Sequence, residues 1–145
     1  MQVVGIIFTE IDCYGDFNWM IKQKKYENCL FLFNDNLEHH FTDRKGAGNA
    51  IIRKYNQYSN LEKPRSYGIP TGTLKEGGFG ELSLEVKFII DKCFEDLKKI
   101  IKKYNYDTII FSRDKNSNKL GTSIFEVNKK VIDYITEKIY NLIYL

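Results

Sequence analysis

The sequence has few of the residues on which disulfide-rich, metal-binding and membrane proteins depend. Its 145 residues include three cysteines, Cys13, Cys29 and Cys93, which are widely spaced and form no CxxC pair. An odd number of separated cysteines favours free thiols in a reducing compartment over a disulfide framework. The two histidines, His39 and His40, are adjacent, and no second pair of ligands with zinc-type spacing accompanies them. We therefore expect loop histidines and no metal site.

Long apolar runs and a strong charge of one sign are also missing. Glu10 and Asp12 interrupt the first apolar run, so no leader is recognisable, and no run approaches the length that spans a bilayer. We expect a soluble cytoplasmic protein, in the host cytoplasm if the chain is viral, with no membrane partner. The 22 basic and 19 acidic residues give a net charge of +3. This charge is too small to indicate nucleic acid, but it does not repel an anionic ligand.

The remaining composition is typical of one globular domain over residues 1–145, with 43% hydrophobic and 28% charged residues and no linker or internal repeat. Apolar runs at 3–8, 29–33 and 108–111 predict buried strands, and 66–73 predicts a short strand that ends near Pro70. Helical spacing predicts a short segment near 19–21 and helices over 49–58, from a Ser83 cap to 104, and over 126–142. This alternation predicts an α/β fold, a three-layer α/β/α sandwich with a mixed, largely parallel sheet.

Small residues at Gly46-Ala47-Gly48-Asn49-Ala50 lead directly into the helix predicted over 49–58. Glycine permits positive φ and close approach to the backbone, and the start of a helix presents unpaired N–H groups. A phosphate or diphosphate suits that environment, although an ordinary turn before a helix has the same composition. A Rossmann turn is excluded, because about a dozen residues separate Phe33 from Gly46 and Ile51 stands at the third glycine position. No Gly-Lys-Ser/Thr follows the glycines, so a Walker A loop is absent as well.

Asn34-Asp35-Asn36 follows the second predicted strand, where ligands of open α/β sheets bind. The carboxylate of Asp35 can accept hydrogen bonds from an adenine amino group or a ribose hydroxyl, or it can simply form a strand-end turn. A nucleophilic cysteine paired with a histidine is a further possibility. Cys29 and Cys93 lie on predicted apolar faces, however, where a structural thiol is usual.

Four motifs in order resemble the macrodomain superfamily and are most similar to its short phage, viral and bacterial members: 32–36, 46–50 with Arg53, 67–71 and 120–122. The resemblance runs from about residue 29 to the C-terminus. Macrodomains bind ADP-ribose and related nucleotides in a crest above the strand ends. The resemblance implies a set of ligand-binding residues, each beside the base, a ribose or the diphosphate of the nucleotide. They are Asn34, Asp35, Asn36, Gly46, Ala47, Gly48, Asn49, Thr71, Gly121, Thr122 and Ser123.

The first glycine loop is also similar to that of macrodomains that remove ADP-ribose from carboxylates or nucleobases. Those relatives use a lysine after the third motif and an acid beyond the late loop, whereas this chain has Gly72 and 123–125 there. Lys75 or Glu126 can take the place of the missing lysine or acid only if their loops fold over the site. The candidate catalytic residues are Asp35 and Lys75. Ser123 also stands where a second glycine is usual, which narrows the space for a diphosphate.

The main expectation is a protein that binds ADP-ribose or an ADP-ribose-derived nucleotide and needs no cofactor. One alternative is a hydrolase that removes ADP-ribose from protein or nucleic acid. The other is a scavenger or sensor of a nucleotide immune signal. Nucleic acid is expected only as a modified substrate.

Overall fold

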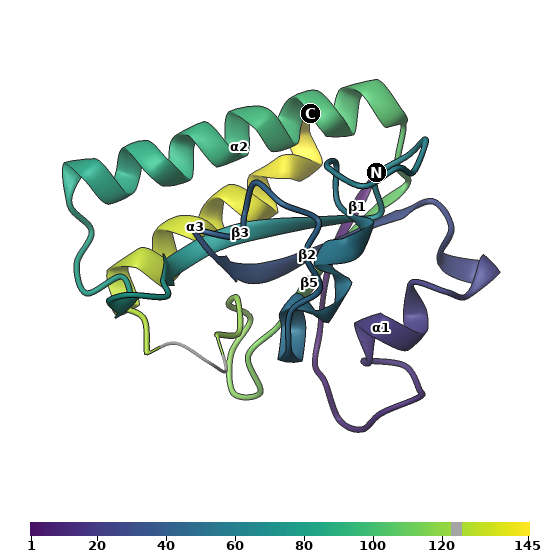
Figure 1. The fold of residues 1–145 in the computed structure, drawn as a ribbon, viewed down its shortest axis with the longest axis horizontal. Coiled ribbons are helices and arrows are strands. Elements are labelled where there is room, and N and C mark those ends of the chain that lie inside the picture. The colour runs from purple at the N-terminus through teal and green to yellow at the C-terminus, as the bar shows by residue number, and fades with distance from the viewer. Residues whose placement is uncertain (123–125) are drawn as a thin grey trace.

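The computed structural model describes residues 1–122 and 126–145 and shows an α/β protein with a five-stranded, strongly curled sheet (Figure 1). The strands are β1 (Gln2–Ile6), β2 (Cys29–Asn36), β3 (Ser66–Thr73), β4 (Gly77–Gly78) and β5 (Thr108–Ser112). The α-helices are α1 (Phe17–Met20), α2 (Leu84–Tyr104) and α3 (Lys129–Asn141). Three 3-10 helices, η1 (Lys24–Tyr26), η2 (Gly48–Tyr55) and η3 (Leu142–Tyr144), complete the described elements. None of the helices in these residues is both long and apolar enough to cross a bilayer.

The sheet has the strand order β1-β5-β2-β3-β4, and all neighbours are parallel except the β3–β4 pair. This confirms the predicted α/β class with a mixed, mostly parallel sheet. The central strand β2 is buried at all eight of its residues, as its continuous apolar run predicted for the first half. Its polar second half was expected beyond the strand, but Asn34–Asn36 pair with β3 and remain in the sheet. Pairing with β3 satisfies the backbone N–H and C=O groups of this polar triplet. Local composition does not reveal such pairing.

The strand β3 also runs further than expected, because Pro70 does not end it. Pro70 lies opposite Asp35, next to a shift in the β2–β3 register, and the strand continues to Thr73. The partner strand β4 reaches only Gly72 and Thr73, so β3 has a single paired neighbour at Pro70. Proline is tolerated where a strand has a free edge or an irregular register.

The helix α2 begins as predicted, since the Ser83 hydroxyl accepts a hydrogen bond from the Val86 N–H at 3.1 Å. The helix α3 begins at Lys129 behind an Asn128 cap, slightly later than expected. The helix expected over 49–58 is instead the 3-10 helix η2, which ends where Asn56 turns extended. The Asn56 side chain donates to the Thr42 carbonyl oxygen at 2.6 Å, which links the end of η2 to the turn that follows β2.

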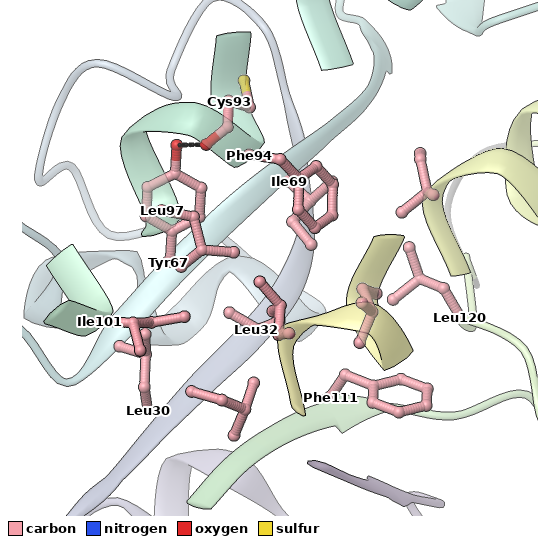
Figure 2. Packing of buried hydrophobic residues seen from close by; sticks show 14 of the residues in the cluster. Leu30, Leu32, Tyr67, Ile69, Cys93, Phe94, Leu97, Ile101, Phe111 and Leu120 are labelled. Carbon is pink, nitrogen blue, oxygen red and sulfur yellow. Dashed lines mark hydrogen bonds between the residues drawn. The ribbon is translucent and has the colours of Figure 1, made fainter. Parts of the chain in front are cut away.

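Helices cover the two faces of the sheet unequally. The larger core lies between the sheet and the pair α2 and α3, which run side by side over one face (Figure 1). Leu32, Ile69, Phe94 and Phe111 belong to this cluster, and the Tyr67 hydroxyl donates to the Cys93 carbonyl oxygen at 2.8 Å within it (Figure 2). A smaller cluster on the other face packs α1 and η2 against β2. These short helices cover only part of that face, and a groove is left near the amino ends of β1, β2 and β5.

Candidate functional site

A cleft of about 300 Å³ lies at the carboxyl end of β2. Its lining residues come from the strand end, the following turn, the glycine loop with η2, and the β3–β4 hairpin: Asn34, Asp35, Asn36, His39, Arg44, Lys45, Gly46, Ala47, Ala50, Arg53 and Leu74. Five of the predicted ligand residues are in this lining. Ligands of open α/β sheets bind at this edge, where the chain leaves the strands.

A larger groove of about 510 Å³ lies at the opposite end of the sheet, near the amino ends of β1, β2 and β5. Its floor is formed by apolar side chains such as Val4 and Ile110, where α1 does not cover the sheet. None of the predicted ligand residues lines it. Polar side chains line both sites, but the smaller cleft lies where the chain leaves the carboxyl ends of the strands, which is where ligands of open α/β sheets bind. We therefore take it as the candidate site.

The floor of the cleft holds a buried ion pair between Asp35 and Arg53, whose side chains are 1% and 2% exposed. Arg53 Nε lies 3.2 and 3.1 Å from the two carboxylate oxygens, and Arg53 Nη2 donates to Oδ1 as well. The backbone N–H of Asn36 donates to the same oxygen at 2.8 Å. Oδ1 thus accepts three of these hydrogen bonds and Oδ2 accepts one, and those from the guanidinium are charge-assisted. Asp35 is therefore engaged within the protein.

Two neighbours complete the surroundings of this ion pair. Gly68 on β3 provides the space for the carboxylate, because a Cβ at this position would lie 2.4 Å from Asp35 Oδ2. Arg53 Nη1 donates to the carbonyl oxygen of Arg44 at 2.9 Å. The buried guanidinium thus fixes the backbone of the basic segment that precedes the glycine loop. The sequence pattern includes Arg53 only as part of the 46–50 motif and does not predict its ion pair. The partner, Asp35, is 18 residues away along the chain.

Amide side chains flank the ion pair. The Asn49 amide donates to Asn34 Oδ1 at 2.8 Å, which connects the start of η2 to β2. Asn36 Oδ1 accepts the N–H of His39, also at 2.8 Å. Each of these two amide oxygens therefore already accepts one hydrogen bond, whereas Asn34 Nδ2 has no acceptor within residues 1–122 and 126–145.

The glycine loop forms one wall of the cleft through Gly46 and Ala47. Gly48 has φ = 58°, so it needs the left-handed backbone for which glycine is suited. Gly46 is packed closely against Ala50, because a Cβ at Gly46 would lie 2.7 Å from the Ala50 Cβ. The Gly46 N–H donates to the Ala50 carbonyl oxygen. That N–H is not available to an anion. The charge of this wall comes from Arg44 and Lys45, which the sequence analysis overlooked although they directly precede the loop.

The other predicted ligand residues do not line the cleft. Thr71 is fully buried, and its hydroxyl donates to the Asp35 carbonyl oxygen at 3.5 Å. The Gly121 N–H donates to Ser112, and both Gly121 and Thr122 are half-buried outside the lining. Ser123 lies outside the described residues. Within those residues, the late loop does not form a second wall.

The candidate catalytic residue Lys75 is exposed at the tip of the β3–β4 hairpin, next to Leu74, which does line the cleft. Glu38 holds this hairpin, because its carboxylate accepts the Leu74 N–H at 2.9 and 3.1 Å. The same backbone hydrogen bond lowers the pKa of Glu38. Glu126, the other possible substitute, is exposed and does not line the cleft.

A histidine–cysteine pair lies beneath the turn that follows β2. His40 is buried, with Nδ1 2.8 Å from the Gly68 carbonyl oxygen and Nε2 3.9 Å from Cys93 Sγ. Since a carbonyl only accepts, Nδ1 carries the proton and Nε2 is left to accept from the thiol. Burial lowers the pKa of His40 and raises that of Cys93 to about 12. The pair is thus a neutral thiol beside a neutral imidazole, without the thiolate that nucleophilic catalysis requires.

The described residues contain no cluster of three or more His, Cys, Asp or Glu side chains able to hold a metal ion. Cys13, Cys29 and Cys93 are free thiols. Comparisons of the chain with protein-family models, with curated proteins and with solved structures gave no match.

Proposed function

We propose that this protein binds ADP-ribose or an ADP-ribose-derived nucleotide in the cleft at the end of β2. We also propose that its architecture is a three-layer α/β/α sandwich of the macrodomain kind. The two sets of helices support this architecture, since α2 and α3 pack on one face of the sheet and α1 and η2 on the other.

The observation that carries the proposal is the chemistry of the lining. Asn34, Asn36 and the glycine loop meet there with the cationic side chains of Arg44 and Lys45. Among the described residues, Asp35 has the only carboxylate in the lining, and Arg53 already neutralises it. Two further cations and the Asn34 amide N–H therefore remain for the ligand. Phosphate oxygens are the acceptors that such a set of charged donors recognises best.

The hydrolase alternative has less support from the site. A hydrolase needs a free general acid or base, and the Asp35 carboxylate is engaged by Arg53 and by a backbone N–H. Lys75 is close to the cleft along the chain but exposed to solvent. Loss of turnover in Lys75→Ala would support hydrolysis, whereas binding without turnover fits a binder, a scavenger or a sensor.

Titration calorimetry with ADP-ribose and with its cyclic and phosphorylated relatives tests the proposal. We expect binding that weakens as salt rises, because Arg44 and Lys45 are charged donors. The double variant Arg44→Gln/Lys45→Gln should weaken it by at least tenfold, which corresponds to about 1.4 kcal/mol. Lys99→Gln, which changes an exposed lysine on α2, is the matched control. No binding of any of these ligands at millimolar concentration would refute the proposal.

A further inference from the structure

Within residues 1–122 and 126–145, the cleft has few side-chain acceptors that are free of a hydrogen bond. A site that selects adenine through its amino group must accept a hydrogen bond from that group, so it needs an acceptor of its own. Asp35 accepts from Arg53 and from the Asn36 N–H, and the side-chain oxygens of Asn34 and Asn36 accept from Asn49 and His39. Each side-chain oxygen that lines the cleft thus belongs to a residue whose oxygen already accepts a hydrogen bond within the protein.

Two backbone carbonyl oxygens of the lining are engaged in the same way. The Arg44 carbonyl oxygen accepts from Arg53 Nη1 at 2.9 Å, and the Ala50 carbonyl oxygen accepts from the Gly46 N–H at 3.1 Å. The remaining side-chain groups of the lining are mainly donors: the Arg44 guanidinium, the Lys45 ammonium and the Asn34 amide N–H. The His39 ring joins them, because its Nδ1 lies 3.5 Å from the Asn36 amide N–H donor, which leaves the proton on Nε2. These groups suit anionic and hydroxyl oxygens, which belong to the phosphate and the sugar of a nucleotide.

The size of the cleft agrees with its chemistry. A volume of about 300 Å³ is at the lower limit of ordinary ligand pockets, which reach about 1,000 Å³. Such a space accommodates a phosphate with its adjoining sugar more readily than a complete nucleotide sugar. The base of a bound nucleotide is then left at the rim.

We infer that the cleft recognises the phosphate and sugar of its ligand and does not read the base. This inference rests on the proposed function and specifies its substrate class as phosphorylated sugars and nucleoside diphosphates, whatever their base. Arg44 and Lys45 contact the phosphate, while the Asn34 amide donates to a sugar or phosphate oxygen. The Asp35–Arg53 pair acts indirectly, because it holds the backbone of Arg44.

Calorimetry with ADP, GDP, CDP, ribose 5-phosphate and adenosine tests the inference on the intact protein. We expect the three diphosphates to bind within tenfold of one another, a limit that corresponds to about one good hydrogen bond. Ribose 5-phosphate should bind, and adenosine should not. The variant Arg44→Gln/Lys45→Gln should weaken all three diphosphates by a similar factor, and Lys99→Gln should weaken none.

The possible failures are distinguishable. If ADP binds more than tenfold tighter than GDP and CDP, or if adenosine binds, the cleft reads the base and the inference is wrong, but the proposed function stands. If the diphosphates bind alike and ADP-ribose does not bind, the inference stands and the proposed ligand is wrong. If no phosphorylated ligand binds, both are wrong.

Discussion

The two halves of β2 are buried to the same degree but have opposite chemistry. Residues 29–33 are apolar and pack between helices on both faces of the sheet, whereas Asn34–Asn36 are polar and no more than 8% exposed. The first half is stabilised by apolar area removed from water, about 1.5–3 kcal/mol for each large side chain. The second half is tolerated because the side-chain oxygens of all three residues accept specific hydrogen bonds within the protein.

This difference determines how much each half can vary. An apolar core position accepts another side chain of similar volume, because the contacts are non-directional. A buried carboxylate accepts almost no change, since it needs its counter-charge and donors at fixed positions. The polar half therefore defines the cleft geometry, and the apolar half anchors the strand on which that geometry is built.

The largest effect is expected from removing one partner of the ion pair. Arg53→Met leaves the Asp35 carboxylate buried without its counter-charge and should cost about 3–5 kcal/mol of unfolding free energy. Replacing both partners, as Asp35→Leu/Arg53→Met, should cost much less than the sum of the two single changes. Urea unfolding of the four proteins measures this coupling. Additive losses would show that the two side chains do not depend on each other.

The apolar half should respond to volume instead of to chemical identity. Leu32 is fully buried in the larger core, so Leu32→Ala should cost about 2–5 kcal/mol because it leaves a cavity. Leu32→Met keeps the volume and should cost less than about 1.5 kcal/mol. If methionine is as damaging as alanine in urea unfolding, the contrast between the two halves is wrong.

A smaller effect is expected at Gly68, whose missing side chain makes room for Asp35. In Gly68→Ala the new methyl group would lie 2.4 Å from a carboxylate oxygen of Asp35. Either the Asp35–Arg53 ion pair or the strand must therefore shift, which should lower the free energy of unfolding by about 1–3 kcal/mol. Gly80→Ala is the matched control, since nothing lies within 4 Å of a Cβ there. Thermal unfolding should show a lower Tm for the first variant only. Equal Tm values would mean that the carboxylate has space to spare.

The smallest effect is a loss of stability in mild acid. Burial lowers the pKa of His40, so the unfolded chain, with a histidine pKa of about 6.5, binds the proton before the folded chain does. Stability is therefore complete above about pH 6.5 and falls as the pH drops towards the lowered pKa. Asp35 and Asp96 oppose this shift, and Arg53 adds to it. Urea midpoints at several pH values should depend less on pH between 6.5 and 5 in His40→Gln than in the parent protein.

His39→Gln is the control for that measurement, because His39 lines the open cleft and its substitution leaves the buried ring in place. We expect this variant to keep the pH dependence of the parent protein. An unchanged profile in His40→Gln would assign the dependence to another group.

Local sequence patterns determined the fold class and most elements of this protein. Continuous β-branched and aromatic runs predicted β1, β2 and β5, and apolar spacing with the Ser83 cap predicted α2. These signals act over a few residues, because alternation, helical periodicity and capping are local properties of the chain. The polar triplet after Phe33 also predicted a ligand crevice at the carboxyl end of β2, and a cleft of about 300 Å³ lies there.

Tertiary structure alone decided how that cleft is built. Asp35 was expected to face a ligand, but η2 brings Arg53 to it across 18 residues and Gly68 on β3 makes room for it. Pro70 and Asn34–Asn36 remain in strands because of neighbours that local pattern does not specify. A buried polar group takes whichever partner the fold brings to it, and that choice depends on segments that are distant in the sequence.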